Sequence, residues 1–408
     1  MKKDSEVLRN LGKRMAEIAA LPVQLEKRAL WSENNDLRPV RPMVFMDQLP
    51  WGEINKSDEM RLSCEDHFLR TVEQSIREIL YRWVHFPCDM VVENRIDVPK
   101  SVRNLHYGIH ISEEVIAFDP SNDIVSHKYD DQIKDFKELA ALREDEVGVD
   151  AAADQQRLDI LNDIFAGIIP VRLSGVQIHA GIWDRIAQMR PAENVLWDLA
   201  DKPQLIEATV QRFVELTQAT VDQCERLGLL DPALQYIHCS GAYTSDLPGD
   251  RFDGDTALAK DCWAFGMAQL FSTVSPAMHD EYEIEMVKPL YERFGLLYYG
   301  CCEPLHDRIH LIRKLKNVRK ISVSPWADAD VSAERIGRDY VLSCKVNPAF
   351  IANGFEQEQI VRQMEQTISA ARKNGTPTEF ILKDVSTVGN RLERLDAWEK
   401  LAMRLVDA

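Results

Sequence analysis

Short apolar segments that alternate with helical patterns fill the second half of this chain. The segments are apolar on both faces and rich in β-branched or aromatic residues, which is typical of buried parallel strands. Helical patterns separate most of them, and one of these ends in Lys-Asn-Gly, a helix stop. Strand–helix units in this order predict a parallel sheet. The predicted strands are 233–239, 262–272, 295–301, 319–324, 339–346 and 379–385, and the helices are 276–294, 304–317, 332–338 and 356–375.

The first half is less regular but adds further strands. Candidates lie at 41–47, 88–94 and 168–179, with helices at 65–83 and 203–228. Eight or nine strands alternating with helices favour the α/β class and a (β/α)8 TIM barrel over residues 41–408, preceded by an N-terminal helical extension at 1–40. An open doubly wound sheet is the alternative. It is weakened because the sequence has no Gly-x-Gly-x-x-Gly motif and no phosphate-loop lysine.

Charge and hydropathy narrow the classes of partner. A formal net charge of −17 argues against nucleic acid or an anionic membrane as the main partner. No run of about 18 apolar residues predicts a membrane span, and the charged amphipathic N-terminal segment lacks the apolar core of a signal peptide. We therefore expect a cytoplasmic protein, either a monomer or a homodimer. Its eight cysteines are then free thiols, buried packers or metal ligands rather than disulfides.

Three predicted strands end in sulfur or imidazole side chains, in "IHCSG", "GCCEP" and "LSCKV". Active sites of such barrels lie at the carboxyl ends of the strands, and thiolate, imidazole and carboxylate are zinc ligands. Strand alternation would put one of the two adjacent cysteines on the opposite face, as a buried packer. It would likewise let only one of His238 and Cys239 face inward, with the histidine preferred. Core filling remains the alternative for each member, since no Cys-x-x-Cys is present. The candidate metal set is His238, Cys301, Cys302, Glu303 and Cys344.

An aromatic strand accompanies these donors. In "CWAFGMAQ" the residues Trp263, Phe265, Met267 and Gln269 alternate along one predicted strand face. Core packing is the default interpretation. The functional one is a flat apolar pocket wall with an amide for orientation, to which Tyr298 and Trp51 could contribute.

Two long stretches carry a family resemblance. Residues 275–309 ("SPAMHDEYEIEMVKPLYERFGLLYYGCCEPLHDRI") and 318–351 ("VRKISVSPWADADVSAERIGRDYVLSCKVNPAFI") resemble the uroporphyrinogen decarboxylase superfamily. Residues 41–54 and 89–99 fit the first two strands of that family, whose fold is a (β/α)8 barrel. Members that decarboxylate the porphyrinogen carry arginines in the first-strand loop. That loop reads "MDQLPWGE" here, so we do not expect this tetracarboxylate as substrate.

The other branch of the superfamily contains corrinoid-dependent methyltransferases with a catalytic zinc. Their ligands are a His-x-Cys on one strand and a late cysteine. The corresponding positions here are Gly300, Cys302 and Val385–Ser386. The resemblance therefore implies a zinc site assembled differently, with Glu303, His238 and Cys344 as replacements. It also implies a corrinoid carried by a separate protein, which would explain the absence of a small-cofactor motif.

The function implied by this branch is zinc-dependent O-demethylation. A methyl group would pass from a small methoxylated donor to Co(I) of the corrinoid protein, while zinc stabilises the leaving oxygen. An aromatic donor is favoured, and methanol-like donors and methylamines stay open. A metal-free decarboxylase or lyase of the same superfamily and a non-catalytic corrinoid-protein partner are the alternatives. The catalytic candidates are Glu303 and Asp47, and the candidate donor pocket consists of Trp51, Trp263, Phe265, Gln269 and Tyr298.

Overall fold

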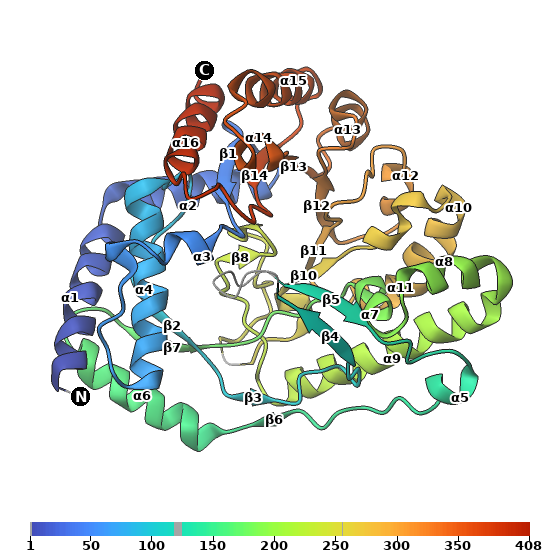
Figure 1. Ribbon diagram of the computed structural model, residues 1–408, viewed down its shortest axis with the longest axis horizontal. Helices are drawn as coiled ribbons and strands as arrows, with labels where there is room; N and C mark the ends of the chain where they lie inside the picture. Colours follow the sequence, from blue (N-terminus) through green and yellow to red (C-terminus); the bar gives the residue numbers. More distant parts are fainter. Residues whose placement is uncertain (1, 118–124, 255) are drawn as a thin grey trace.

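The computed structural model describes residues 2–117, 125–254 and 256–408. Six parallel strands form one sheet in the order β1-β14-β13-β12-β11-β10, so the first strand of the chain lies beside the last. Figure 1 shows these strands around a common centre, with the helices outside them. The strands are β1 (Met43–Met46), β10 (Trp263–Gly266), β11 (Leu296–Tyr299), β12 (Val318–Val323), β13 (Val341–Val346) and β14 (Thr378–Leu382).

One further segment lies beside each edge strand of this sheet, β1 and β10. The Asp89 N–H donates to the Val44 carbonyl of β1 (3.0 Å), and His179 forms a parallel bridge with Phe265 of β10. Beside them, β2 (Ile96–Pro99) pairs in parallel with β7 (Val171–Ser174). A mixed α/β fold with a parallel six-stranded sheet is thus confirmed. Closure into an eight-stranded barrel stays a prediction, because the continuous ladder covers six strands.

Most of the predicted helices are present. Helix α4 begins after Asp66, whose side chain accepts a hydrogen bond from the Leu69 N–H, and α15 ends at Gly375 in the left-handed conformation (φ 66°). The segment 276–294 is divided by a π-helical turn at Asp280–Glu285, and the segment 304–317 keeps one short helix. The helices near the sheet are α3 (Trp51–Ile54), α4 (His67–His85), α7 (Ile182–Met189), α9 (Pro203–Arg226), α10 (Pro276–His279), α11 (Met286–Tyr291), α12 (Ile309–Ile312), α13 (Ala329–Ile336), α14 (Ala349–Ala352), α15 (Gln357–Asn374) and α16 (Glu393–Val406).

The remaining elements lie at the ends and in the long insertions. The chain begins with two helices that pack on the same body, since α1 contacts α4 and α6 and Trp31 of α2 donates to the Asp89 carbonyl (2.8 Å). No helix in the described ranges is long and apolar enough to cross a bilayer. These elements are α1 (Lys2–Ala19), α2 (Pro22–Asn35), α5 (Phe136–Leu139), α6 (Ala151–Phe165), α8 (Ala192–Asp201), and the pairs β3 (Val102–Arg103) with β6 (Gly148–Val149) and β4 (Glu113–Ile116) with β5 (Ser126–Tyr129).

The predicted strand at 233–239 is wrong. The segment instead forms a small antiparallel hairpin of β8 (Tyr236–Ile237) and β9 (Ser240–Gly241), with His238 at its turn in a left-handed conformation (φ 53°). Side chains of this hairpin touch β10, β11, β12, β13 and β14. One small hairpin can reach five strands only from their concave side, and Figure 1 shows β8 inside the ring of strands. The hairpin therefore fills the interior of the curved sheet.

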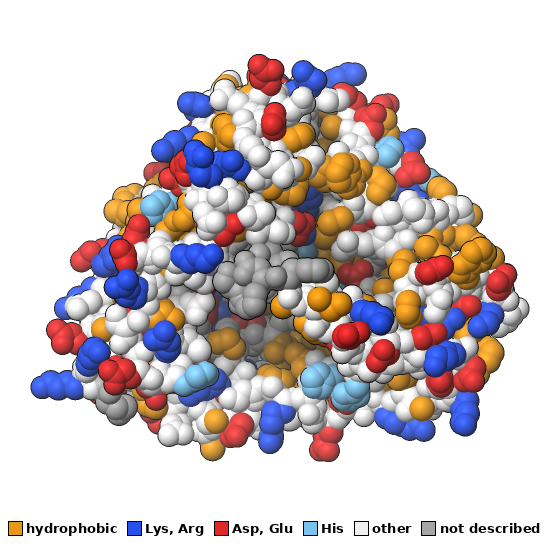
Figure 2. Space-filling model, in the orientation of Figure 1, with side chains coloured by type: hydrophobic (Ala, Val, Ile, Leu, Met, Phe, Trp, Pro, Cys, Tyr) orange, Lys and Arg blue, Asp and Glu red, His pale blue; other side chains and the backbone are white. Residues whose placement is uncertain are grey.

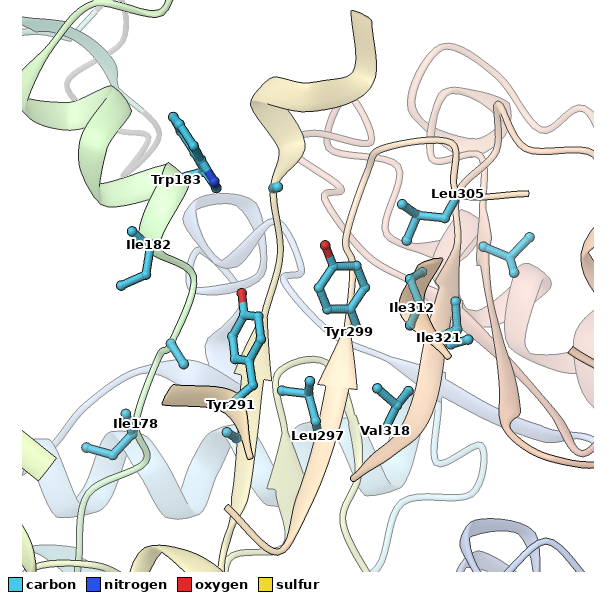
Figure 3. Close-up of a cluster of buried hydrophobic side chains, with 14 of the residues drawn as sticks. Ile178, Ile182, Trp183, Tyr291, Leu297, Tyr299, Leu305, Ile312, Val318 and Ile321 are labelled. Atoms are coloured by element: carbon cyan, nitrogen blue, oxygen red, sulfur yellow. The ribbon is translucent and has the colours of Figure 1, made fainter. Parts of the chain in front are cut away.

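The convex side of the sheet packs against the helices. Figure 3 shows Leu297 and Tyr299 of β11 and Ile321 of β12 within one cluster, together with Trp183 from α7 and Tyr291 from α11. These side chains are fully buried. Since successive residues of a strand point to opposite faces, the neighbour Tyr298 is left to point to the concave side.

Candidate functional site

The doubled cysteine lies at a turn that only glycine can begin. Strand β11 ends at Tyr299, and Gly300 has a φ of +90°. A Cβ on Gly300 would lie 2.4 Å from Cδ1 of Leu305, so any larger residue would collide there. Strand alternation no longer applies beyond this turn. As a result, the Sγ atoms of Cys301 and Cys302 lie 3.6 Å apart instead of on opposite faces.

His238 reaches this turn from the interior hairpin. Its imidazole stacks on the Phe265 ring, with centroids 3.8 Å apart and planes inclined by 6°. Its Nε2 lies 3.6 Å from the Cys301 Sγ. The prediction that only one of His238 and Cys239 faces inward is wrong, because the hairpin is surrounded by strands: Cys239 also contacts inner groups of the sheet.

Lys383 completes the cluster, and sequence reasoning missed it. Its ammonium donates to the Cys301 Sγ (3.2 Å) and to His238 Nε2 (3.4 Å) and pairs with Asp384 (3.2 Å). The Asp384 carboxylate in turn lies 3.9 Å from the Cys302 Sγ. A signal was available in "EFILKDV", where a lysine and an aspartate directly follow an apolar strand and therefore lie at its carboxyl end.

The contacts set different protonation states for the two thiols. The hydrogen bond between them raises the pKa of Cys301, and burial raises it further. The same hydrogen bond lowers the pKa of Cys302, and the positive charge of Lys383 lowers it as well. Cys302, which is partly exposed, is therefore the thiol that ionises first. Burial alone would lower the pKa of Lys383, but the charges of Cys239 and Cys301 outweigh it and raise that pKa.

A second group of polar side chains lies deeper between the strands. The buried Lys345 ammonium donates to Cys239 Sγ (2.9 Å), to Ser343 Oγ (3.2 Å) and to the Tyr298 hydroxyl. The Tyr298 hydroxyl is also 2.7 Å from Ser343 Oγ. Tyr298 is thus held by polar partners below the cluster, and its ring lies 5.6 Å from that of Phe265. Both aromatic side chains belong to the wall beneath the thiols.

Glu303 does not turn toward the thiols. Its carboxylate is fully buried and accepts hydrogen bonds from the backbone N–H groups of Cys301 (2.9 Å) and Ala268 (3.2 Å). It therefore holds the cysteine loop against the end of β10. Nearby, the half-buried Asp184 at the start of α7 has its pKa raised to about 7 by burial and by the charge of Glu303. Asp184 was not singled out from the sequence, because nothing in α7 marks it.

Cys344 and Trp263 lie away from the cluster, and Gln269 is not on the predicted strand. The Cys344 thiol faces Thr367 of α15 (3.8 Å), on the convex side. Trp263 lies at the opposite end of β10 from the cluster, where its Nε1 donates to the Ala242 carbonyl (3.0 Å). Gln269 is not on the strand, since β10 ends at Gly266; it begins a 3-10 helix, and its Nε2 lies 3.2 Å from Sδ of Met267.

Asp47 and Trp51 lie at the carboxyl end of the parallel strands, the same end as the cluster. Asp47 directly follows β1, and its N–H donates to the Leu382 carbonyl (2.9 Å), one residue before Lys383. Trp51 begins α3, which follows β1 on the same side. Figure 2 shows a hollow near the centre of the face that Figure 1 presents.

The cluster contains suitable donors for zinc. Ligands held at about 2.0–2.3 Å from a tetrahedral zinc stand about 3.3–3.8 Å apart. The separations of Cys301 from His238 and from Cys302, both 3.6 Å, fit this value. Within the described residues, no group of three His, Cys, Asp or Glu side chains is arranged to hold a metal ion. The donors fit zinc in kind and in pairwise spacing, and binding would require the Lys383 ammonium to move aside.

Comparison with known proteins supports the fold. No family model and no curated protein sequence matches the chain. Among solved structures, a methyltransferase from Methanosarcina mazei superposes with a TM-score of 0.51 at 11% sequence identity, over 92% of this chain and 97% of the other. At this identity the likeness extends to the fold over nearly the whole length of both chains.

Proposed function

We propose that this protein is a methyltransferase that moves a methyl group from a methoxylated, aromatic donor to the Co(I) corrinoid of a separate protein. We further propose a (β/α)8 barrel with zinc held by Cys301, Cys302 and His238. The single observation that carries this proposal is the spacing of the Cys301 thiol, 3.6 Å from both His238 Nε2 and Cys302 Sγ, at the carboxyl end of parallel strands. The structural likeness to a protein named as a methyltransferase supports the reaction class.

The residues around the cluster suit this chemistry. Bound zinc would supply a Lewis acid for the ether oxygen of the donor. The Lys383 ammonium stabilises thiolate at the cysteines and would stabilise negative charge on a leaving oxygen, because attraction between opposite charges is strong in a partly buried site. The parallel, stacked rings of His238 and Phe265 would form part of an aromatic wall for an aryl group. Glu303 has a positioning role through the Cys301 backbone.

Asp184 and Asp47 complete the proposed chemistry. A carboxyl group with a pKa of about 7 is half protonated near neutral pH, so Asp184 can donate a proton to a departing alkoxide or phenoxide. Asp47 and Trp51, which follow β1 beside Lys383, form the rim at which the donor enters.

A metal-free lyase of the same superfamily is the second candidate. One observation favours it: the Lys383 ammonium stands within 3.4 Å of both Cys301 and His238, in the place where a metal cation would compete. Together with the buried ammonium of Lys345, it could instead bind a substrate carboxylate. The two candidates differ in their need for zinc.

Metal content of protein purified without oxygen tests the proposal. We expect about one zinc per chain in the wild type, lost in Cys301→Ser and kept in Cys262→Ser, a buried thiol elsewhere in the core. The same samples are mixed with a methoxybenzoate and free Co(I) cobalamin, and the methylated cobalamin is followed by absorbance. Absence of zinc after anaerobic reconstitution would refute the methyltransferase and favour the lyase. Zinc binding without methyl transfer from any methoxylated, methanol-like or methylamine donor would favour a non-catalytic corrinoid-protein partner.

A further inference from the structure

A cavity lies on the flank of the sheet, apart from the cysteine cluster. It has a volume of about 640 Å³ and lies between the inner face of α4 and the segments 90–100, 174–177 and 234–236. None of the cysteine-cluster residues lines it. Helices normally pack against strands with almost no voids, whereas this volume falls in the range of small-molecule sites. The cavity is therefore a candidate binding site in its own right.

The cavity is elongated along α4. Phe68 and Arg82 of α4 both line it, and their separation of fourteen positions corresponds to about 20 Å along the helix axis. Between these ends the wall is mainly apolar, with Val72, Ile76 and Ile79 on the α4 side. An apolar lining of this length can accommodate an extended chain.

The charge of the lining is opposite to that of the protein. Four cations and two carboxylates line the cavity in a chain whose net charge is −17. Both carboxylates already have partners: Glu93 pairs with Arg28 (2.5 Å), and Asp97 pairs with Arg172 (2.5 Å). The lining cations are Arg82, Arg95, Lys100 and Arg157.

Within the described residues, two of these cations form no ion pair: Lys100, which donates to the Gly228 carbonyl (2.6 Å), and Arg82. Arg82 donates through Nη2 to the Met46 carbonyl (2.5 Å), and its guanidinium lies 4.9 Å from the centroid of the Phe45 ring. Among the described residues it forms no ion pair, and its Nε is buried without an acceptor. The other two cations, Arg95 and Arg157, pair with carboxylates, as Arg157 does with Asp154 (2.5 Å). A guanidinium in this state is suited to an anion that can bind two of its N–H groups.

We propose that this cavity binds an amphipathic carboxylate with a single extended apolar chain. The carboxylate lies at Arg82, and the chain extends along α4 toward Phe68. This inference does not depend on the proposed methyl transfer, because it concerns other residues, apart from the cysteine cluster.

Calorimetric titration with dodecanoate, below its micelle concentration, tests this proposal. We expect one saturable site per chain in the wild type. Dodecanol and dodecyltrimethylammonium, which share the chain but not the anionic group, should bind at least tenfold more weakly. Arg82→Met should weaken dodecanoate binding at least tenfold and leave dodecanol binding unchanged. Arg61→Met, which removes a charge from an exposed side chain, is the matched control and should change nothing.

A second variant tests the cavity independently, in case Arg82→Met fails to fold. Ser75 is an exposed residue of α4 on the cavity wall, so Ser75→Phe adds bulk where space is available. We expect this variant to melt as the wild type does and to lose dodecanoate binding. The proposal is overturned if the wild type shows no saturable binding, if dodecanol binds as well as dodecanoate, or if a folded Ser75→Phe binds with unchanged affinity.

Discussion

A buried ion pair holds the interior hairpin in place and allows a quantitative test of the fold. The Lys320 ammonium of β12 lies 2.8 Å from Glu379 Oε2 of β14, and both side chains are fully buried. The same ammonium donates to Ser240 Oγ (2.6 Å) and to the Gly241 carbonyl (2.9 Å) of β9. Lys320→Met removes these interactions and keeps the length of the side chain.

The expected cost follows from the burial of the partner. Removing one member of a buried pair leaves the other charge without compensation, which costs about 3–5 kcal/mol. In Lys320→Met, the Ser240 hydroxyl is the one donor that the described part of the chain leaves to Glu379. Replacing both charges with Met restores an apolar contact and removes the uncompensated charge. We therefore expect the double variant Lys320→Met, Glu379→Met to be more stable than Lys320→Met alone.

Urea unfolding, followed by circular dichroism, measures the free energies of unfolding. Lys288→Met is the control, since Lys288 forms a partly exposed ion pair with Glu292 at 3.9 Å, which is worth about 0–1 kcal/mol. A loss below about 1 kcal/mol in Lys320→Met, or a double variant less stable than the single one, would refute the reasoning.

Three further predictions concern the site. The rate of Cys302 alkylation by iodoacetamide, followed by mass spectrometry, should depend on pH with a pKa below the ordinary cysteine value. Lys383→Met should raise that pKa and slow the reaction at pH 7. An unchanged pH profile in this variant would contradict the role of the ammonium. Asp184 has its pKa raised by folding, so it favours the folded state at low pH and this stability is lost as pH rises through about 7. Asp184→Asn should therefore raise the thermal midpoint more at pH 8 than at pH 5, and an equal shift at both pH values would count against this. Gly300→Ala should lower the free energy of unfolding by about 1–3 kcal/mol, because φ is +90° and Leu305 lies too close. Gly228→Ala, also at positive φ but with no atom within 4 Å, should lower it less. Equal melting temperatures of the two variants would contradict the steric argument.

Much of the sheet could be predicted from the sequence. The predicted strands at 41–47, 319–324, 339–346 and 379–385 correspond to β1, β12, β13 and β14 within a few residues. The reason is that a strand covered on both faces must be apolar throughout, and this local pattern is visible in the sequence. The stop of α15 at Gly375 was visible for the same kind of local reason, since a left-handed residue after a helix favours glycine.

The interior hairpin shows where local patterns are insufficient. "ALQYIHC" is as apolar as a buried strand, but its residues are buried because strands surround the hairpin, not because it belongs to the sheet. The sequence alone cannot distinguish these two kinds of burial. For the same reason, it could not show that His238 and Cys239 both reach inner groups.

The α/β class, the parallel strands and the sulfur-rich turn at the carboxyl end of one strand follow from local sequence, because they depend on residues close together in the chain. Which donors meet depends instead on tertiary contacts. Gly300 ends strand alternation, so both cysteines join the cluster, while Cys344 turns to the helices and Glu303 to backbone N–H groups. Lys383 and His238 are 145 residues apart in the chain and 3.4 Å apart in space. Such contacts depend on the curvature and register of the sheet, which are properties of the whole fold.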